Sequence, residues 1–392
     1  MHQVAVDRRV GAARLDRFMK LALVVHDFDP GYGQGRYCVE LARRLAGRLP
    51  IDVHSNTWNT DSIPGVRWHR VPAWRHNVVT TVTTFLPSVS QSLRRNPATL
   101  VHAQGLSCWT ADLITAHICN AARQAHLQES PLTARIFTQG ITPIERAFYR
   151  RQHDAHLIAV SGVVRREIEQ HYGWSGRSSV IHHGTDVSRF RPPESASETA
   201  LLRARFGVPP GAWCWLFVGE GIKGLIPLIH QLVKFPSAQL LAITRSDPGR
   251  YRALAEQLGV AQRLILHGPE RQLELAYRAA DVFVYPAEYD SFALVATEAM
   301  ASGLPVILGG AIGAAELVEP GKNGLLCDPR DPGSLQHHLH WIQSHPDESR
   351  RLGRAARTTL ESNTWAECAE ATWRVYQAEL GRRAASPTGG LL

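Results

Sequence analysis

The sequence predicts an α/β protein made of two doubly wound parallel-sheet domains, and three observations support this fold class. Short runs of apolar and β-branched residues alternate with segments of helical periodicity from Leu21 nearly to the end of the chain. Such alternation is typical of parallel sheets covered by helices on both faces. The length of 392 residues suits two domains of this kind better than one. A single proline-containing interruption divides the pattern into two stretches.

The predicted strands and helices follow one another in regular order. Strands are expected at residues 21–25, 51–54, 100–103, 113–116, 157–160 and 180–182, and again at 215–218, 240–243, 264–266, 282–285, 306–308 and 325–327. Apolar positions recur at helical spacing in residues 35–49, 163–172, 250–258 and 271–279. A last amphipathic helix is expected over 365–382, capped by Asn363 or Thr364.

The interruption lies where Phe190-Arg191-Pro192-Pro193 is followed by Ser, Glu and Ala residues, a composition typical of a linker. We therefore expect a ligand site between the facing carboxyl edges of two sheets. The predicted parts are a disordered extension (1–18), an N-terminal domain (19–186), a linker (187–210), a C-terminal domain (211–364), the last helix (365–382) and a disordered tail (383–392).

Composition narrows the class of protein. The net charge of +8 and the pI near 9.4 favour anionic partners such as nucleotide phosphates, acidic glycans or an anionic membrane. The arginines are dispersed and not interleaved with aromatic residues, so nucleic acid is not expected as a partner. The six cysteines form no CxxC pair, which indicates reduced thiols in a cytoplasmic protein and no zinc site. The N-terminal segment lacks the apolar core of a signal peptide.

The segment from Tyr285 to Pro305 carries the strongest indication of chemistry. A strand ends, a loop with carboxylates follows, and a helix runs to Gly303. Asp290 precedes this helix and Glu298 lies two turns into it. One carboxylate could therefore meet sugar hydroxyls and the other a ribose diol, while the amides at the start of the helix could receive a phosphate or sugar oxygen. The alternative is that Asp290 is an N-cap and Glu298 a solvated helix residue.

This segment resembles the E-x7-E signature of retaining GT-B glycosyltransferases, the group 1 or family 4 class, and the match includes Glu-Ala-Met-Ala-Ser-Gly-Leu-Pro-Val-Ile. Asp290 stands where the family more often has Glu, and Ala293 where Gly is usual. The resemblance implies a GT-B fold of two Rossmann-like domains, transfer with retention, no metal and no cofactor besides the nucleotide-sugar co-substrate. It also implies a set of donor-binding residues in this segment: Asp290, Ser291, Phe292, Ala293, Leu294, Val295 and Glu298.

The glycines of Gly31-Tyr32-Gly33-Gln34-Gly35 follow the first strand and open a helix. They look like the N-domain glycine loop of the same family, which implies donor contacts at Gly33 and Gly35 and an acceptor contact at Tyr32. A side chain would block such an approach of the backbone to a ligand. A plain turn is the alternative. A dehydrogenase is disfavoured because Arg36 takes the place of the third glycine of GxGxxG.

Two histidines follow strands of the first domain. His117 comes after the strand at 113–116 and resembles the family histidine that lies beside the transferring sugar, which implies a catalytic role. His102 lies in a loop-edge segment that could contact the acceptor or stabilise the loop. For both residues the alternative is a structural histidine.

Lys223 follows the strand at 215–218 and precedes a helix expected from Leu225 to Val233. It resembles the family lysine that binds the donor diphosphate, so ammonium and helix N-terminus would act together on the leaving group. Glu220 stands where the family often has arginine, and Arg245, after the next strand, is the candidate to replace that charge.

The predicted activity is transfer of a hexose-type sugar from a nucleoside-diphosphate sugar to a glycan, a lipid-linked or a small-molecule acceptor. The alternative is an inactive GT-B-like protein that binds nucleotide or glycan. We interpret Asp27-Phe28-Asp29 as a turn rather than a metal site, and we expect no metal at His182 and His183. The segment 78–93, flanked by basic residues, is either a core helix or a peripheral contact with the inner face of a membrane.

Overall fold

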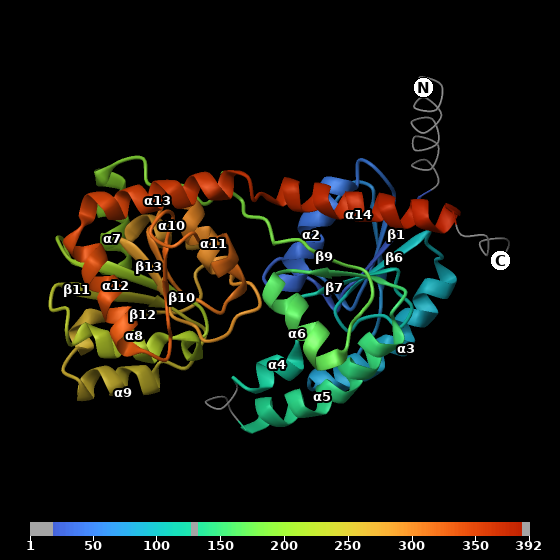
Figure 1. Cartoon of the computed structure of the whole chain (residues 1–392), viewed down its shortest axis with the longest axis horizontal. Coiled ribbons are helices and arrows are strands. Elements are labelled where there is room, and N and C mark those ends of the chain that lie inside the picture. Colours follow the sequence, from blue (N-terminus) through green and yellow to red (C-terminus); the bar gives the residue numbers. More distant parts are fainter. Residues whose placement is uncertain (1–18, 127–131, 386–392) are drawn as a thin grey trace, which may run out of the picture. The chain divides into compact units, whose positions relative to one another are not determined.

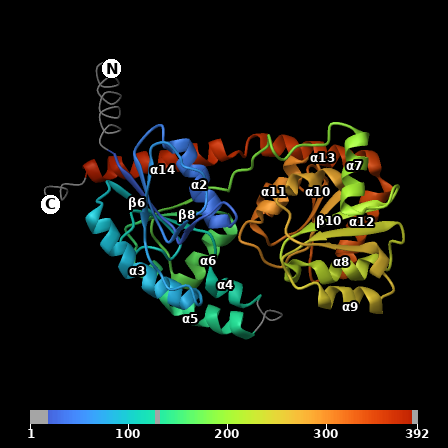
Figure 2. The ribbon, with the colours of Figure 1, turned by 180° about the vertical axis from the view of Figure 1, so that it is seen from behind.

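The structure is a computed structural model that describes residues 19–126 and 132–385. The extension predicted for residues 1–18 lies outside the described residues, and so does most of the predicted tail. The chain divides into two compact units, drawn in Figures 1 and 2. Unit 1 consists of residues up to His183 together with those from Trp365 onward, and unit 2 consists of Gly184–Thr364.

Unit 1 is built on a parallel seven-stranded sheet of order β5-β3-β1-β6-β7-β8-β9. Its strands are β1 (Leu21–Val24), β3 (Ile51–Ser55), β5 (Val66–Arg70), β6 (Leu100–Gln104), β7 (Leu113–Ala116), β8 (His156–Ala159) and β9 (Ser178–Val180). β2 (Asp27–Phe28) and β4 (Thr57–Trp58) form a small separate sheet. The central strands are buried on both faces, which explains their unbroken apolar runs.

Strand β5 was not predicted from the sequence. It lies at the edge of the sheet and pairs only with β3. Its residues, Val66-Arg67-Trp68-His69-Arg70, are half-buried or exposed throughout, so the strand lacks the apolar signal that marks its neighbours.

Helices cover both faces of the unit 1 sheet. They are α2 (Gly33–Leu45), α3 (Val78–Arg95), α4 (Asn120–Gln124), α5 (Leu132–Arg151), α6 (Gly162–Tyr172) and α14 (Trp365–Ala385). In Figures 1 and 2, α2 and α14 lie together on one side of the sheet, and α3 and α5 lie together on the other.

Helix α3 contains the segment for which a membrane contact was considered. Its apolar side chains Val82, Phe85, Leu86 and Val89 are buried in unit 1. Asn77 caps the helix through a capping box with Thr80, whose amide lies 2.9 Å from the Asn77 Oδ1 atom. This packing favours the core-helix alternative. Among the helices of the described residues, none has the length and hydropathy needed to cross a membrane.

Unit 2 contains a parallel six-stranded sheet of order β12-β11-β10-β13-β14-β15. Its strands are β10 (Trp213–Val218), β11 (Ala238–Ile243), β12 (Leu264–His267), β13 (Val282–Tyr285), β14 (Val306–Gly309) and β15 (Leu325–Cys327). Its helices are α7 (Ala196–Phe206), α8 (Leu225–Leu232), α9 (Gly249–Gln257), α10 (Leu273–Ala279), α11 (Leu294–Ala301), α12 (Pro332–Ser344) and α13 (Pro346–Glu361), with 3-10 turns η1 (Gly221–Lys223), η2 (Ala261–Arg263) and η3 (Gly313–Leu317). Both sheets are of the doubly wound type that the alternating pattern predicts.

The predicted linker contains a helix. Helix α7 lies within residues 187–210 and packs against α10, so this segment is part of unit 2. The Ser195 hydroxyl accepts a hydrogen bond from the Glu198 amide at 3.1 Å, and Gly207 ends the helix in the left-handed conformation with φ of 73°. The sequence contains signals for both ends of this helix, Ser195-x-x-Glu198 at its start and Gly207 at its end. The helix was not predicted because the preceding prolines suggested a linker.

Helix α14 follows unit 2 in the sequence but packs against α2 of unit 1. The Thr372 hydroxyl lies 3.4 Å from the Tyr37 hydroxyl, and the Tyr376 hydroxyl lies 2.7 Å from His102 Nδ1. Glu379 is almost fully buried and forms an ion pair with Arg177 at 2.8 Å. The helix also continues three residues beyond the predicted end, to Ala385.

The six cysteines are all buried and unpaired, as predicted from their spacing. Burial raises the pKa of the Cys214 thiol to about 12 and that of Cys119 to about 12, so neither is a thiolate near neutral pH.

Candidate functional site

Two loops at the carboxyl edge of the unit 2 sheet bring Lys223 and Asp290 together. Lys223 ends the 3-10 turn that follows β10, and Asp290 follows β13, the neighbour of β10 in the sheet. Lys223 Nζ lies 2.6 Å from Asp290 Oδ2. The carboxyl edge of adjacent parallel strands is where ligands bind in open α/β sheets. The sequence therefore predicted the position of both residues, but not their ion pair.

Asp290 is held by four donors. Its Oδ2 atom also accepts a hydrogen bond from the Tyr285 hydroxyl at 2.8 Å, and its Oδ1 atom accepts from the amides of Phe292 at 3.1 Å and Ala293 at 2.9 Å. Burial alone would raise the pKa of the Asp290 carboxyl, but Lys223 and these donors outweigh burial and lower it below its usual value. Asp290 is thus ionised, holds the loop before α11 and orients Lys223. It is not the N-cap of α11, because that position is occupied by Ala293 and the amides that Asp290 binds precede the helix.

Ala293 adopts an unusual backbone conformation. Its φ of 68° and ψ of 70° lie in the left-handed region, and it is the one non-glycine residue with positive φ in the described part of the chain. Glycine, which the family resemblance predicts at this position, adopts this conformation without strain, whereas Ala does not. A left-handed L-residue costs about 1–2 kcal/mol. The conformation turns the chain from the Asp290 loop into α11.

We expect Ala293→Gly to be tolerated far better than Ala299→Gly, a matched change at a buried position inside α11. Glycine at 293 relieves backbone strain, whereas glycine at 299 destabilises the interior of a helix. The free energy of unfolding of Ala293→Gly should therefore be about 2 kcal/mol higher than that of Ala299→Gly. Urea denaturation of both variants measures the difference. Equal destabilisation would show that Ala293 is not strained.

The start of α11 leaves amides for a ligand. The Phe292 and Ala293 amides are used by Asp290, so they are not available to a phosphate as the sequence had suggested. Leu294 and Val295 are the first residues of α11, and their amides have no intrahelical acceptor. Asp290 joins these residues to Lys223, because it contacts the Lys223 ammonium and the amides directly before α11. The Leu294 and Val295 amides are therefore better placed to bind an anion than those of Phe292 and Ala293. Ser291 is half-buried in the same loop.

Glu298 is buried inside unit 2, with 4% of its surface exposed. Its Oε2 atom accepts a hydrogen bond from the Tyr277 hydroxyl at 3.1 Å, and the same hydroxyl lies 3.0 Å from the Val295 carbonyl oxygen. The expectation of a solvated helix residue is therefore wrong for Glu298, because the α10 tyrosine holds it in a fixed position. A buried, hydrogen-bonded carboxylate is suited to binding a diol.

Arg245 and Glu220 lie on neighbouring loops of the same edge. Arg245 follows β11, which pairs with β10, and its side chain is exposed. The Gly221 amide donates to the Ser246 hydroxyl at 2.9 Å, which ties the loop after β11 to the loop after β10. The loop that contains Arg245 therefore lies beside the Lys223 turn, and Glu220 is exposed directly before that turn. The role of Arg245 as a replacement cation stays a prediction.

In the glycine loop of unit 1, Gly35 is packed against the chain's own backbone, whereas Gly33 is open to solvent. A Cβ atom at Gly35 would lie 2.2 Å from the Asp29 carbonyl oxygen, so glycine is required there by the chain's own backbone. A Cβ atom at Gly33 meets nothing within 4 Å, and Tyr32 is 57% exposed. Gly33 and Tyr32 can therefore meet a ligand, whereas Gly35 is needed for packing of α2 against the loop that contains Asp29.

His117 lies at the carboxyl edge of the unit 1 sheet, directly after β7. Its Nε2 atom donates to the Gln104 Oε1 atom at 2.8 Å, and 7% of the residue is exposed. Burial, followed by the neighbouring His183 and His102, lowers the pKa of His117 well below its usual value. His117 is therefore neutral near pH 7 and can act as a hydrogen-bond group but not as a cation.

His102 does not reach the surface. It is fully buried, and its Nε2 and Nδ1 atoms lie 2.7 Å from the Thr115 and Tyr376 hydroxyls, respectively. Burial lowers its pKa to about 3. The acceptor contact considered for His102 is not supported, because both ring nitrogens are used to join the sheet to α14.

The structure adds three residues that the sequence did not single out. Tyr285 and Tyr277 orient Asp290 and Glu298. Gln104 binds His117, and its Nε2 atom is buried with no hydrogen-bond partner among the described residues. Tyr285 lies in the segment from Tyr285 to Pro305 that resembles the family signature, and Gln104 is the last residue of β6. Their positions in the sequence could therefore have marked both as site residues. Tyr277 lies in a helix of ordinary apolar spacing, and nothing in the sequence marks it.

Possible metal ligands are occupied by protein groups. Asp27 and Phe28 form strand β2, which pairs with β4, so the predicted turn is wrong for these two residues. The Asp27 carboxylate accepts from the Thr57 hydroxyl and pairs with Arg75 at 3.0 Å. Among the described residues, one group has ligand atoms close together: Asp52, His54 and His69. Asp52 is already paired with Lys20 at 2.7 Å and Arg67 at 3.0 Å, so a divalent cation would meet two positive charges there. We interpret this group as a buried ion-pair cluster.

Comparisons with known proteins agree with the two-unit architecture. The family model described as Glycosyltransferase Family 4 matches residues 32–189, and that described as Glycosyl transferases group 1 matches residues 216–359. The D-inositol 3-phosphate glycosyltransferase of Streptomyces bingchenggensis is 35% identical over 56% of this chain and 52% of its own length. That of Streptomyces scabiei is 28% identical over 89% of this chain and 86% of its own length. The chain thus spans about half the length of the first curated relatives that it matches.

Solved structures show the same fold. Sucrose-phosphate synthase from Thermosynechococcus elongatus aligns with a TM-score of 0.80 and 24% identity, over 93% of this chain and 100% of its own. HepE of Anabaena, in a complex with UDP-glucose, aligns with a TM-score of 0.70 and 18% identity, over 92% of this chain and 100% of its own. With two matched family models that together make up more than half of its residues, the chain belongs to the group 1 glycosyltransferases of GT-B fold.

Proposed function

We propose that this protein is a metal-independent, retaining glycosyltransferase that takes a hexose from a nucleoside-diphosphate sugar. The observation that supports this most is the Lys223–Asp290 ion pair beside the start of α11, with Glu298 buried in the same helix. A lysine and helix amides suit a diphosphate, and a fixed carboxylate suits a ribose. The complex of HepE with UDP-glucose supports a uridine nucleotide as the first donor to test.

In the proposed reaction the bond between the anomeric carbon and the diphosphate oxygen breaks, and a bond to the acceptor oxygen forms on the same face. The proton of the acceptor hydroxyl passes to the departing diphosphate. Negative charge grows on the departing diphosphate. Lys223 and the Leu294 and Val295 amides would stabilise this charge, with Arg245 as an additional cation. Asp290 would keep the ammonium in place. Neutral His117 donates its Nε2 hydrogen to Gln104, so its Nδ1 atom would accept a hydrogen bond from a hydroxyl of the transferring sugar.

The acceptor class stays open among a glycan, a lipid-linked saccharide and a small molecule. The curated relatives are named for D-inositol 3-phosphate, so inositol phosphates belong in the first acceptor panel. Exposed Tyr32 and Gly33 are the proposed acceptor-side contacts of unit 1. A cytoplasmic location with peripheral membrane contact remains a prediction.

The experiment that tests the function is release of nucleoside diphosphate from UDP-, GDP- and ADP-sugars, with and without the acceptor panel. Product analysis by NMR then gives the anomeric configuration, and added EDTA tests the independence of metal. Donor-dependent release with a retained configuration is expected. Tight nucleotide binding without release for any donor would favour the inactive binding protein, for which exposed Glu220 in place of arginine is the supporting feature.

A further inference from the structure

A pocket lies in unit 2, at the opposite edge of the sheet from the proposed donor site. Its volume is about 930 Å³, within the range of pockets that hold small molecules. Its lining includes residues at the amino ends of four parallel strands: Trp213 of β10, Ser237 before β11, Asp281 before β13 and Pro305 before β14. Lys223 and Asp290 follow the carboxyl ends of β10 and β13, so a donor held there does not fill this pocket.

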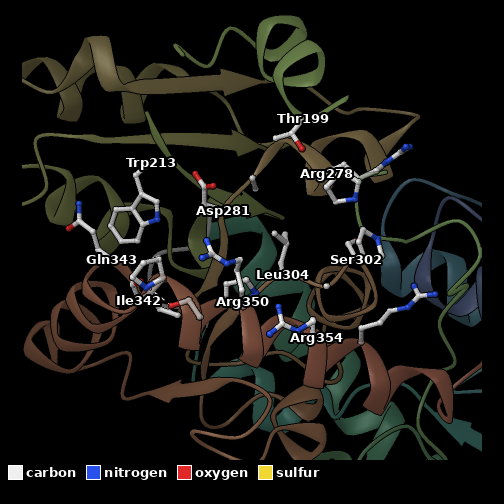
Figure 3. Close-up of a pocket in the computed structure, with 18 of the residues that line it drawn as sticks. Thr199, Trp213, Arg278, Asp281, Ser302, Leu304, Ile342, Gln343, Arg350 and Arg354 are labelled. Atoms are coloured by element: carbon white, nitrogen blue, oxygen red, sulfur yellow. Dashed lines mark hydrogen bonds between the residues drawn. The ribbon is translucent and has the colours of Figure 1, made fainter. Parts of the chain in front are cut away.

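Arginines dominate the charge of this pocket. Arg350, Arg354 and Arg357 line it from α13 at spacings of four and three residues, which places them on one face of the helix. Arg278 of α10 lines it as well. Figure 3 shows Arg350 and Arg354 on one side of the pocket and Trp213 and Asp281 across from them.

Three of the four pocket arginines, Arg278, Arg350 and Arg357, have an acidic partner. The one acid in the lining, Asp281, is paired with Arg203 at 2.6 Å. Arg278 is paired with Glu198. Arg350 contacts Asp347, but both side chains are more than 60% exposed, and such a pair contributes little. Arg357 pairs with Glu361 at 3.5 Å and donates to the carbonyl oxygens of Phe190 and Ala301, each at 2.6 Å. Arg354 is the pocket arginine that has no acidic partner among the described residues, and its charge is the one most available to a ligand.

The remaining lining determines which anion fits. Trp213 is half-buried and offers an aromatic wall, and the almost fully buried side chains of Leu304 and Ile342 also line the pocket. Guanidinium groups bind phosphate oxygens through paired hydrogen bonds, while an indole packs against the carbon skeleton of a sugar. A phosphorylated sugar uses both parts, whereas inorganic phosphate uses only one.

We propose that this arginine pocket, formed by Trp213, Arg278, Leu304, Arg350, Arg354 and Arg357, binds a small sugar phosphate at a site separate from the donor site. The pocket and the donor site share a helix. Ser302, at the carboxyl end of α11, lines the pocket and donates to the Glu298 carbonyl oxygen at 2.9 Å, while the start of α11 lies at the donor site.

The test is calorimetric titration of the full chain with glucose 6-phosphate, and in parallel with inorganic phosphate and with glucose. We expect saturable binding of the sugar phosphate, weaker binding of phosphate and none of glucose. The double variant Arg350→Gln/Arg354→Gln should weaken glucose 6-phosphate about tenfold or more, because it removes two charged hydrogen-bond donors. Thermal unfolding checks that both exposed positions tolerate the change.

Two control variants make the outcome decisive. Arg351→Gln changes an exposed arginine of the same helix that does not line the pocket and should leave binding unchanged. Lys223→Ala impairs the donor site. This variant should bind UDP more weakly but should bind glucose 6-phosphate as the wild type does. No saturable binding, equal loss in Arg351→Gln, or loss in Lys223→Ala with retention in the double variant would each overturn the proposal. None of these results depends on transferase activity.

Discussion

Replacing Lys223 by alanine is expected to lower the rate of sugar transfer by about 10²- to 10³-fold, the usual effect of removing one group that stabilises charge in a transition state. The ammonium is proposed to act on the departing diphosphate, so the loss should appear in kcat. Steady-state measurement of nucleoside diphosphate release, with the best donor from the panel, gives the value. Lys322→Ala, at an exposed lysine of the same unit, is the matched control and should keep full activity.

The ion pair complicates this variant, because Lys223→Ala also leaves the ionised Asp290 carboxylate, whose side chain is 11% exposed, without its cation. Some loss of thermal stability is therefore expected. The double variant Lys223→Ala/Asp290→Asn removes the remaining charge and should recover much of that stability. It should not recover activity. If the double variant transfers sugar at nearly the wild-type rate, Lys223 has a structural role and the assignment fails.

The second large effect is expected for Glu298→Ala, which should raise the KM for the donor by about 10- to 100-fold. A charged hydrogen bond contributes about 1.5–3 kcal/mol, and the ribose contact exists before and during the reaction, so its loss weakens binding more than it slows the chemical step. KM and kcat measured over donor concentration separate the two effects. Glu319→Gln, at an exposed acid of unit 2, serves as the control.

Glu298→Gln and Tyr277→Phe refine this test. Glutamine keeps an oxygen that can accept from the Tyr277 hydroxyl but lacks the negative charge. Tyr277→Phe keeps the charge but removes the hydrogen bond that positions it. A KM increase in both variants, smaller in Tyr277→Phe, is expected for a carboxylate that binds the ribose and a tyrosine that orients it. An unchanged donor KM in Glu298→Gln and Glu298→Ala would contradict the proposed contact.

The sequence was sufficient for the elements whose signal is local. Eleven of the twelve predicted strands are present with nearly their predicted bounds, because strands such as Val282–Tyr285 are buried on both faces and form unbroken apolar runs. The strand predicted at 180–182 is instead Ser178–Val180, a half-buried strand at the sheet edge. The carboxyl-edge positions of Lys223, Asp290 and His117 also followed from the sequence, since parallel strands end at the same edge. The resemblance to a glycosyltransferase family then pointed to these residues.

Elements that depend on partners far along the chain needed the tertiary structure. Edge strand β5 is stabilised by pairing with β3 and not by its own residues, and α14 is assigned to unit 1 only by its contacts with α2. His102 looked like a ligand contact until its two hydrogen bonds placed it in the core. Lys223 and Asp290, 67 residues apart, were predicted to bind different parts of a ligand and instead pair with each other. Local patterns determine which segments form helices and strands, whereas the burial and pairing of a polar side chain depend on what the fold packs against it.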